Sequence, residues 1–133
     1  MKKIVALVII CTIISLPVSA VSSSAKAAAV INGDTGEALY AQNADMRLPM
    51  ASTTKIMTCI LALEYGNPDD LVCVSKYAAS MPDVQLNMNT DEYYRLGDLL
   101  YSLMLESHND TAVAIAEHIS GDVSSFAALM NEK

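Results

Sequence analysis

The chain has 133 residues, of which 53% are apolar, enough for one small core or for part of a larger domain. A net charge of −7, from 15 acidic and 8 basic residues, argues against nucleic acid as a partner, because such partners favour clustered lysine and arginine. The few histidines and cysteines are widely spaced and give no metal-site signature, so we expect no metal and no other cofactor.

Residues 1–20 have the three parts of a secretory signal peptide. A positively charged start precedes the apolar residues 4–18, and Val18-Ser19-Ala20 fits a cleavage site with small residues, as does Ala25-Lys26-Ala27. The apolar stretch is short for a membrane-spanning helix of about 20 residues, although a retained anchor is the alternative. We therefore expect an exported, extracytoplasmic protein with a polar linker over residues 21–27.

A β-hairpin is predicted directly after the linker. Residues 28–32 and 37–42 have the character of strands, and Gly33-Asp34-Thr35-Gly36 between them supplies turn residues. Residues 43–50 then form a connecting loop. Two strands cannot make a stable sheet alone, so this hairpin requires further partners.

A helix is predicted from about residue 53 to residue 64, where apolar residues recur with helical spacing before Gly66-Asn67-Pro68. At its start, the three-residue spacing of Ser52 and Lys55 places both side chains on one face. A serine nucleophile needs a neighbouring base, and a lysine can be that base if its surroundings lower its pKa. The two residues are therefore a candidate nucleophile and base, and the alternative is a capping serine followed by a solvated lysine.

The segment after this helix is less informative. Residues 71–75 are predicted to form a short strand or an extended segment, and residues 76–90 are predicted to form mostly a loop. Cys59 lies among apolar residues of the helix, which favours a buried, inert thiol. An exported protein could instead join Cys59 to Cys73 in a disulfide.

Three further helices are predicted in the second half of the chain. The first carries apolar residues from Leu96 to Met104, the second begins near residue 109 or 110 and ends at Gly121, and the last is capped by Ser124 or Ser125. The triplet Ser107-His108-Asn109 falls in the join between the first two.

The join can point the side chains of Ser107 and Asn109 into a cleft. The alternative is that Ser107 merely ends one helix and Asn109 caps the next. A Ser-His-Asp triad through His108 and Asp110 is disfavoured, since Lys55 already fills the role of the base. The other histidine, His118, lies within a helix and is expected to be structural.

Three segments carry a family resemblance: Ala51-Ser52-Thr53-Thr54-Lys55-Ile56-Met57-Thr58, Ser107-His108-Asn109-Asp110-Thr111-Ala112 and the hairpin around residues 30–37. Together they resemble the serine-type D-alanyl-D-alanine carboxypeptidases, the low-molecular-mass penicillin-binding proteins. The resemblance covers residue 28 to the end of the chain. It implies an α/β fold of the α+β type, penicillin-binding transpeptidase/β-lactamase-like, with a helical cluster on an antiparallel sheet.

The resemblance also implies roles for the site residues. Ser52 would attack the terminal D-Ala-D-Ala bond of a peptidoglycan stem peptide, with Lys55 as general base. Ser107 would relay a proton to the leaving amine, and Asn109 would hydrogen-bond the substrate amide and Lys55. β-Lactam antibiotics would be inhibitors, and a C-terminal segment not present here could associate with the membrane.

The chain departs from the family pattern at two points. His108 stands where many relatives carry a small residue or aspartate, and no Lys-Thr-Gly triplet follows. We therefore expect residues 28–133 to be the N-terminal part of the catalytic domain, incomplete at its C-terminus. The alternatives are a class A β-lactamase, which deacylates with a glutamate placed well after the second motif, and an inactive binding fragment of the same fold.

Overall fold

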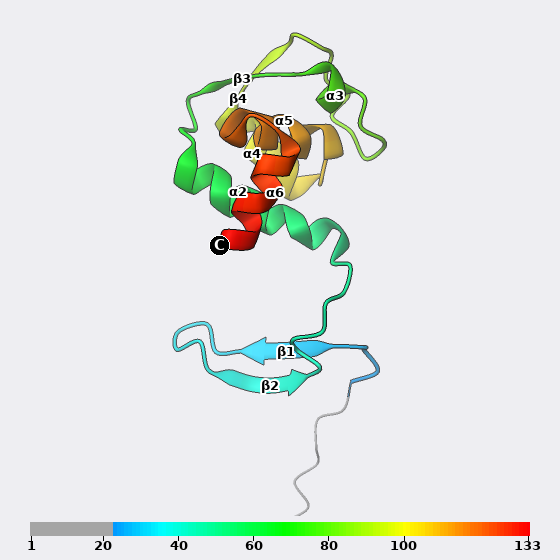
Figure 1. The fold of residues 1–133 in the computed structure, drawn as a ribbon, viewed down its shortest axis with the longest axis vertical. Coiled ribbons are helices and arrows are strands. Elements are labelled where there is room, and N and C mark those ends of the chain that lie inside the picture. Colours follow the sequence, from blue (N-terminus) through cyan, green and yellow to red (C-terminus); the bar gives the residue numbers. More distant parts are fainter. Residues whose placement is uncertain (1–22) are drawn as a thin grey trace, which may run out of the picture. The chain divides into compact units, whose positions relative to one another are not determined.

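The computed structural model describes residues 23–133, so the predicted signal peptide of residues 1–20 lies outside the described residues. The chain divides into two compact units, Met1–Leu48 and Pro49–Lys133 (Figure 1). Within the described part of the chain, no helix has both the length and the apolar character that crossing a bilayer requires.

The first unit contains the predicted β-hairpin. Strand β1 (Ala28–Ile31) pairs antiparallel with β2 (Ala38–Gln42), and the register shifts between Val30 and Ile31. The turn forms because the side-chain Oδ1 of Asn32 accepts hydrogen bonds from the backbone N–H groups of the next residues, while Gly36 adopts a φ of +72°. The hairpin prediction is confirmed, with strand ends that differ by one residue.

The second unit is a cluster of helices. Its elements are the 3₁₀ turn η1 (Ala51–Thr53), α2 (Thr54–Tyr65), α3 (Lys76–Ala79), α4 (Leu96–Leu105), α5 (Asn109–Ser120) and α6 (Val123–Glu132). Helix α5 is central, because it contacts α2, α3, α4 and α6 (Figure 1). The predicted helices are confirmed, including the start of α5 at residue 109.

The apolar spacing of the sequence forms the core of this unit. The largest apolar side chains that are fully buried come from α2, α4 and α5: Leu61, Leu96, Leu99, Leu103 and Ile115. Burial of one such side chain stabilises the fold by about 1.5–3 kcal/mol. This packing holds the start of α2 beside the join between α4 and α5, where the candidate site lies.

The middle of the chain adds two short elements to the predicted ones. Residues 76–90 are mostly loop, as predicted, but the segment opens with the four-residue helix α3, because the Ser75 side chain accepts a hydrogen bond from the Ala78 N–H and caps the helix. The expected short strand is β3 (Leu71–Cys73), but its antiparallel partner β4 (Tyr93–Arg95) was missed. A strand of three residues is too short to show an alternating pattern.

The cap of the last helix is also different from the prediction. Asp122, rather than Ser124 or Ser125, is the N-cap of α6, and its carboxylate accepts a hydrogen bond from the Ser125 N–H at 2.8 Å. Aspartate and serine are about equally good N-caps, so local propensity alone did not decide between neighbouring positions.

Both described cysteines, Cys59 and Cys73, are free thiols. Cys59 is half-buried and packs against the core, and burial raises the pKa of its thiol. A raised pKa lowers the fraction of reactive thiolate, which agrees in direction with the predicted inert thiol, although Cys59 is half-buried where a buried thiol was predicted. The disulfide alternative is wrong for this structure.

Candidate active site

The Lys55 amine contacts the segment that joins α4 to α5. Its Nζ donates hydrogen bonds to Ser107 Oγ at 3.0 Å and to Asn109 Oδ1 at 2.8 Å, and also to the Ser107 carbonyl oxygen. The amine comes from the first turn of α2, and its acceptors come from a segment more than 50 residues away. Three of the four predicted site residues therefore meet at one point.

Ser52, the fourth predicted residue, lies in η1 and faces the same space. It lines a pocket of about 310 Å³ together with Lys55 and Ser107. Its side chain is exposed, and its hydroxyl makes no hydrogen bond to any residue in the described range 23–133. A free and accessible hydroxyl beside an amine can approach an electrophilic carbonyl.

The surroundings of Lys55 make the neutral form of its amine easier to reach than in an ordinary lysine. Burial lowers the pKa of Lys55 from the ordinary lysine value, and the Asp110 carboxylate opposes this shift by raising the pKa. A neutral amine keeps two N–H donors, which can serve the Ser107 carbonyl and Asn109 Oδ1. Its lone pair is then available for the proton of a hydroxyl group.

The backbone of Ser107 explains how one residue offers two acceptors to Lys55. Helix α4 closes at its C-cap Glu106, and the next residue, Ser107, adopts a φ of +61° in the left-handed region. This position after a helix is usually glycine, because a side chain there costs free energy. The reversal directs both the carbonyl and the hydroxyl of Ser107 toward the amine.

Asn109 is not the cap of α5, so that alternative is wrong. The N-cap is His108, and Asn109 is the first helical residue. The Asn109 Nδ2 group donates to the carbonyl oxygens of Pro82 and Asp83, each at 3.0 Å. The carbonyl oxygens of Pro82 and Asp83 can only accept, so these two contacts identify Nδ2 as the group that faces them and leave Oδ1 facing Lys55.

Asp110 is an organising residue that the sequence analysis missed. It is 1% exposed, and its carboxylate accepts hydrogen bonds from the backbone N–H groups of Leu86 at 3.0 Å and Met88 at 3.3 Å. Together with the Asn109 contacts, it holds residues 82–88, which we call the strap, against the start of α5. No sequence signal marked it, since an acidic residue in the first turn of a helix is ordinary.

The rejected Ser-His-Asp triad is not formed in the structure. His108 Nδ1 lies 2.7 Å from Ser102 Oγ, and the Asp110 carboxylate is committed to backbone donors of the strap. His118 lies 3.4 Å from Asp70 instead of facing the candidate site. Within residues 23–133, no group of three or more histidine, cysteine, aspartate or glutamate side chains is placed to hold a metal ion.

Replacing Asp110 by alanine should loosen the strap. Two backbone N–H groups, one buried and one partly buried, would lose their acceptor, and each such loss costs about 1–3 kcal/mol, so we expect the free energy of unfolding to fall by roughly 2–4 kcal/mol. Amide hydrogen exchange at Leu86 and Met88 should accelerate. Asp110→Asn keeps one acceptor oxygen and should cost less.

The matched control is Asp98→Ala, because Asp98 is an exposed acidic residue in the first turn of α4. Denaturant unfolding and hydrogen exchange measured on all three variants decide the outcome. Unchanged exchange at Leu86 and Met88 in Asp110→Ala would show that the carboxylate does not hold the strap.

Comparison with known sequences places this chain in a family. The sequence model of the family described as D-alanyl-D-alanine carboxypeptidase matches residues 15–133. The chain belongs to this family. It is 40% identical over 120 residues to the D-alanyl-D-alanine carboxypeptidase DacF of Bacillus subtilis, covering 86% of this chain and 31% of DacF. The chain thus spans about a third of the length of this relative.

Solved structures of the D-alanyl-D-alanine carboxypeptidase family and other penicillin-binding proteins share the fold. Penicillin binding protein 5 from Haemophilus influenzae superposes with a TM-score of 0.76 at 32% identity, over 86% of this chain and 36% of that one. Penicillin-binding protein D2 from Listeria monocytogenes, solved in an ampicillin-bound form, gives a TM-score of 0.67 at 32% identity, over 84% of this chain and 46% of that one. The predicted fold class is confirmed.

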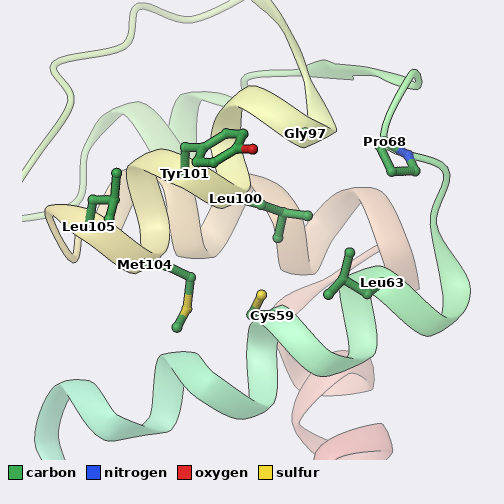
Figure 2. Close-up of a pocket in the computed structure, with 8 residues that line it drawn as sticks. All are labelled: Cys59, Leu63, Pro68, Gly97, Leu100, Tyr101, Met104 and Leu105. Atoms are coloured by element: carbon green, nitrogen blue, oxygen red, sulfur yellow. The ribbon is translucent and has the colours of Figure 1, made fainter.

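This member of the D-alanyl-D-alanine carboxypeptidase family has a second pocket, which is apolar. It has a volume of about 420 Å³, and Figure 2 shows Cys59 and Leu63 of α2 opposite Leu100 and Met104 of α4. Met104 also lines the pocket of Ser52, so the two pockets adjoin. The apolar pocket offers no nucleophile and base pair, so the chemistry of the site is confined to the pocket that Ser52 lines.

Proposed function

We propose that this chain supplies the nucleophile, the base and a proton relay of a serine-type D-Ala-D-Ala carboxypeptidase that trims peptidoglycan stem peptides. The observation that carries the proposal is the Lys55 amine, which contacts Ser107 and Asn109 in the pocket that Ser52 lines. Family membership supports the reaction type. We assign the activity to the whole protein, because the relative DacF is about three times as long as this chain.

The acylation step uses all four residues. Ser52 Oγ attacks the carbonyl carbon of the terminal D-Ala-D-Ala peptide bond, and its proton passes to the neutral Lys55 amine. The C–N bond then breaks, and the leaving amine of D-Ala takes a proton from Lys55 through the Ser107 hydroxyl, 3.0 Å from Nζ. The product is an ester of Ser52 and free D-Ala.

Deacylation reverses these roles with water in place of the serine. Lys55 takes a proton from a water molecule, which attacks the ester carbonyl, and Ser52 Oγ leaves with a returned proton. The Ser52 N–H, near the start of α2, can donate to the developing oxyanion. In the family the second donor follows the Lys-Thr-Gly triplet, which does not occur in these residues.

β-Lactam antibiotics are the proposed inhibitors, since their lactam carbonyl presents the same electrophile to Ser52. The ampicillin-bound form of the Listeria relative supports this extension. We also propose export through the signal peptide of residues 1–20, so that the site reaches the cell wall; a C-terminal segment could add membrane association.

The test is release of D-Ala by the full-length gene product. A peptide ending in D-Ala-D-Ala should lose one D-Ala, and penicillin should block the release. Rapid hydrolysis of penicillin without D-Ala release would favour the β-lactamase alternative. Absence of both activities would favour the inactive binding protein and overturn the proposal.

A further inference from the structure

The imidazole of His108 is tied to both helices that flank the Ser107 turn. Its Nδ1 lies 2.7 Å from Ser102 Oγ on α4, and Ser102 Oγ lies 3.1 Å from Thr111 Oγ1 in the first turn of α5. Thr111 is 0% exposed, so this chain of hydrogen bonds ends in the core. It therefore links α4 to α5 across the turn that contains Ser107.

We call the hydrogen-bonded chain of His108, Ser102 and Thr111 the brace. The turn needs it because the backbone conformation of the turn is strained. Ser107 has a φ of +61°, a left-handed conformation that is unfavourable for a non-glycine residue and persists only where the surroundings impose it. A relaxed turn would move Ser107 Oγ and Asn109 Oδ1 away from Lys55 Nζ, which now lies within 3.0 Å of both.

The hydroxyl groups let the brace persist whether or not the proton of the imidazole sits on Nδ1. When Nδ1 is bare, Ser102 donates its proton to Nδ1 and accepts one from Thr111. When Nδ1 carries a proton, it donates to Ser102 Oγ, and Ser102 donates to Thr111. The three side chains thus remain paired in both cases.

We propose that His108 is a positioning residue, which acts through Ser102 and Thr111 to hold Ser107 and Asn109 at Lys55. The inference rests on the proposed function, because it assigns to His108 a share in the rate of Ser52 acylation. His108 does not itself touch the Lys55 amine, and it exchanges no proton with substrate.

The test compares two substitutions of His108 that differ in reach. The amide atoms of asparagine stand two bonds beyond Cβ, as Nδ1 does, whereas those of glutamine stand three bonds away. His108→Asn should therefore keep the bond to Ser102 and acylate at close to the normal rate. His108→Gln and His108→Ala should acylate about five- to tenfold more slowly, the rate equivalent of one hydrogen bond.

The measurement is acylation of the full-length protein by a fluorescent penicillin, with the acylation rate constant separated from the initial noncovalent affinity. We expect the rate constant to fall and the affinity to stay constant. Ser102→Ala should have a similar effect, and adding it to His108→Ala should cost little more. The matched control is His118→Ala, since the other histidine contacts Asp70 outside the site.

Equal rates for the alanine, glutamine and unaltered proteins would overturn the inference while leaving the proposed function intact. Failure of the unaltered protein to take up label would instead overturn the proposed function. In that case nuclear magnetic resonance still tests whether the hydrogen bond between His108 and Ser102 exists. Ser102→Ala should shift the ¹⁵N resonance of His108 Nδ1, and an unshifted resonance would show that no such hydrogen bond exists.

Discussion

Replacing Ser52 by alanine should abolish covalent labelling of the full-length protein by penicillin. The substitution removes the oxygen that forms the ester, so we expect a loss of at least about 10⁴-fold in the acylation rate, the scale seen when a nucleophile is deleted. The fold should survive, because the Ser52 side chain is exposed and makes no hydrogen bond within the described residues 23–133. Mass spectrometry of the labelled peptide and gel fluorescence measure the effect.

The matched control is Thr53→Ala in the same turn. The Thr53 hydroxyl donates to the Met50 carbonyl at 2.6 Å, so it is engaged in local structure. Thr53→Ala should still take up label at Ser52. Label that persists in Ser52→Ala, or that maps to another residue, would refute the assignment of the nucleophile.

Replacing Lys55 by methionine should lower acylation by about 10²- to 10⁴-fold, the usual contribution of a positioned general base. Methionine keeps an unbranched chain without an amine, so Ser52 loses its proton acceptor, while Ser107 and Asn109 lose their shared donor. The control is Lys76→Met, because Lys76 is an exposed lysine at the start of α3. Equal loss in both variants would show that Lys55 acts only through stability.

The pH dependence provides a second readout of the same residue. The neutral amine is the base, so acylation should increase as pH rises through the pKa of Lys55. Because burial lowers this pKa, the increase should occur at lower pH than for an ordinary lysine. Asp110→Asn removes the carboxylate that raises the Lys55 pKa, so the increase should move to still lower pH; a shift in the opposite direction would contradict this electrostatic role.

The sequence predicted those parts of the site that depend on short-range spacing. Ser52 and Lys55 are three residues apart on a helix with strong apolar periodicity, so both their element and their shared face could be inferred. Ser107 and Asn109 could be inferred from the join between two predicted helices. Their roles in catalysis stay predictions until the substitutions above are measured.

The parts that the sequence did not predict depend on contacts between distant segments. Nothing in residues 82–88 indicates that the carboxylate of Asp110, more than 20 residues later, satisfies the backbone of this strap. Similarly, β4 exists because Tyr94 pairs with Val72, and its three residues show no pattern of their own. His108 was recognised as unusual, but its partner Ser102 precedes it by six residues across a left-handed turn, where helical spacing no longer applies.

The Asn109 amide has a consequence for substrate recognition. Both protons of its Nδ2 group are already given to the carbonyls of Pro82 and Asp83, and its oxygen is given to Lys55. A substrate carbonyl can gain this amide as a donor only by exchange, with one strap carbonyl released in return. We therefore expect the affinity for a stem peptide to depend on how much stronger the hydrogen bond from Asn109 to the substrate is than the hydrogen bond from Asn109 to the strap. Substitutions in the strap would then change substrate choice without altering the reacting atoms.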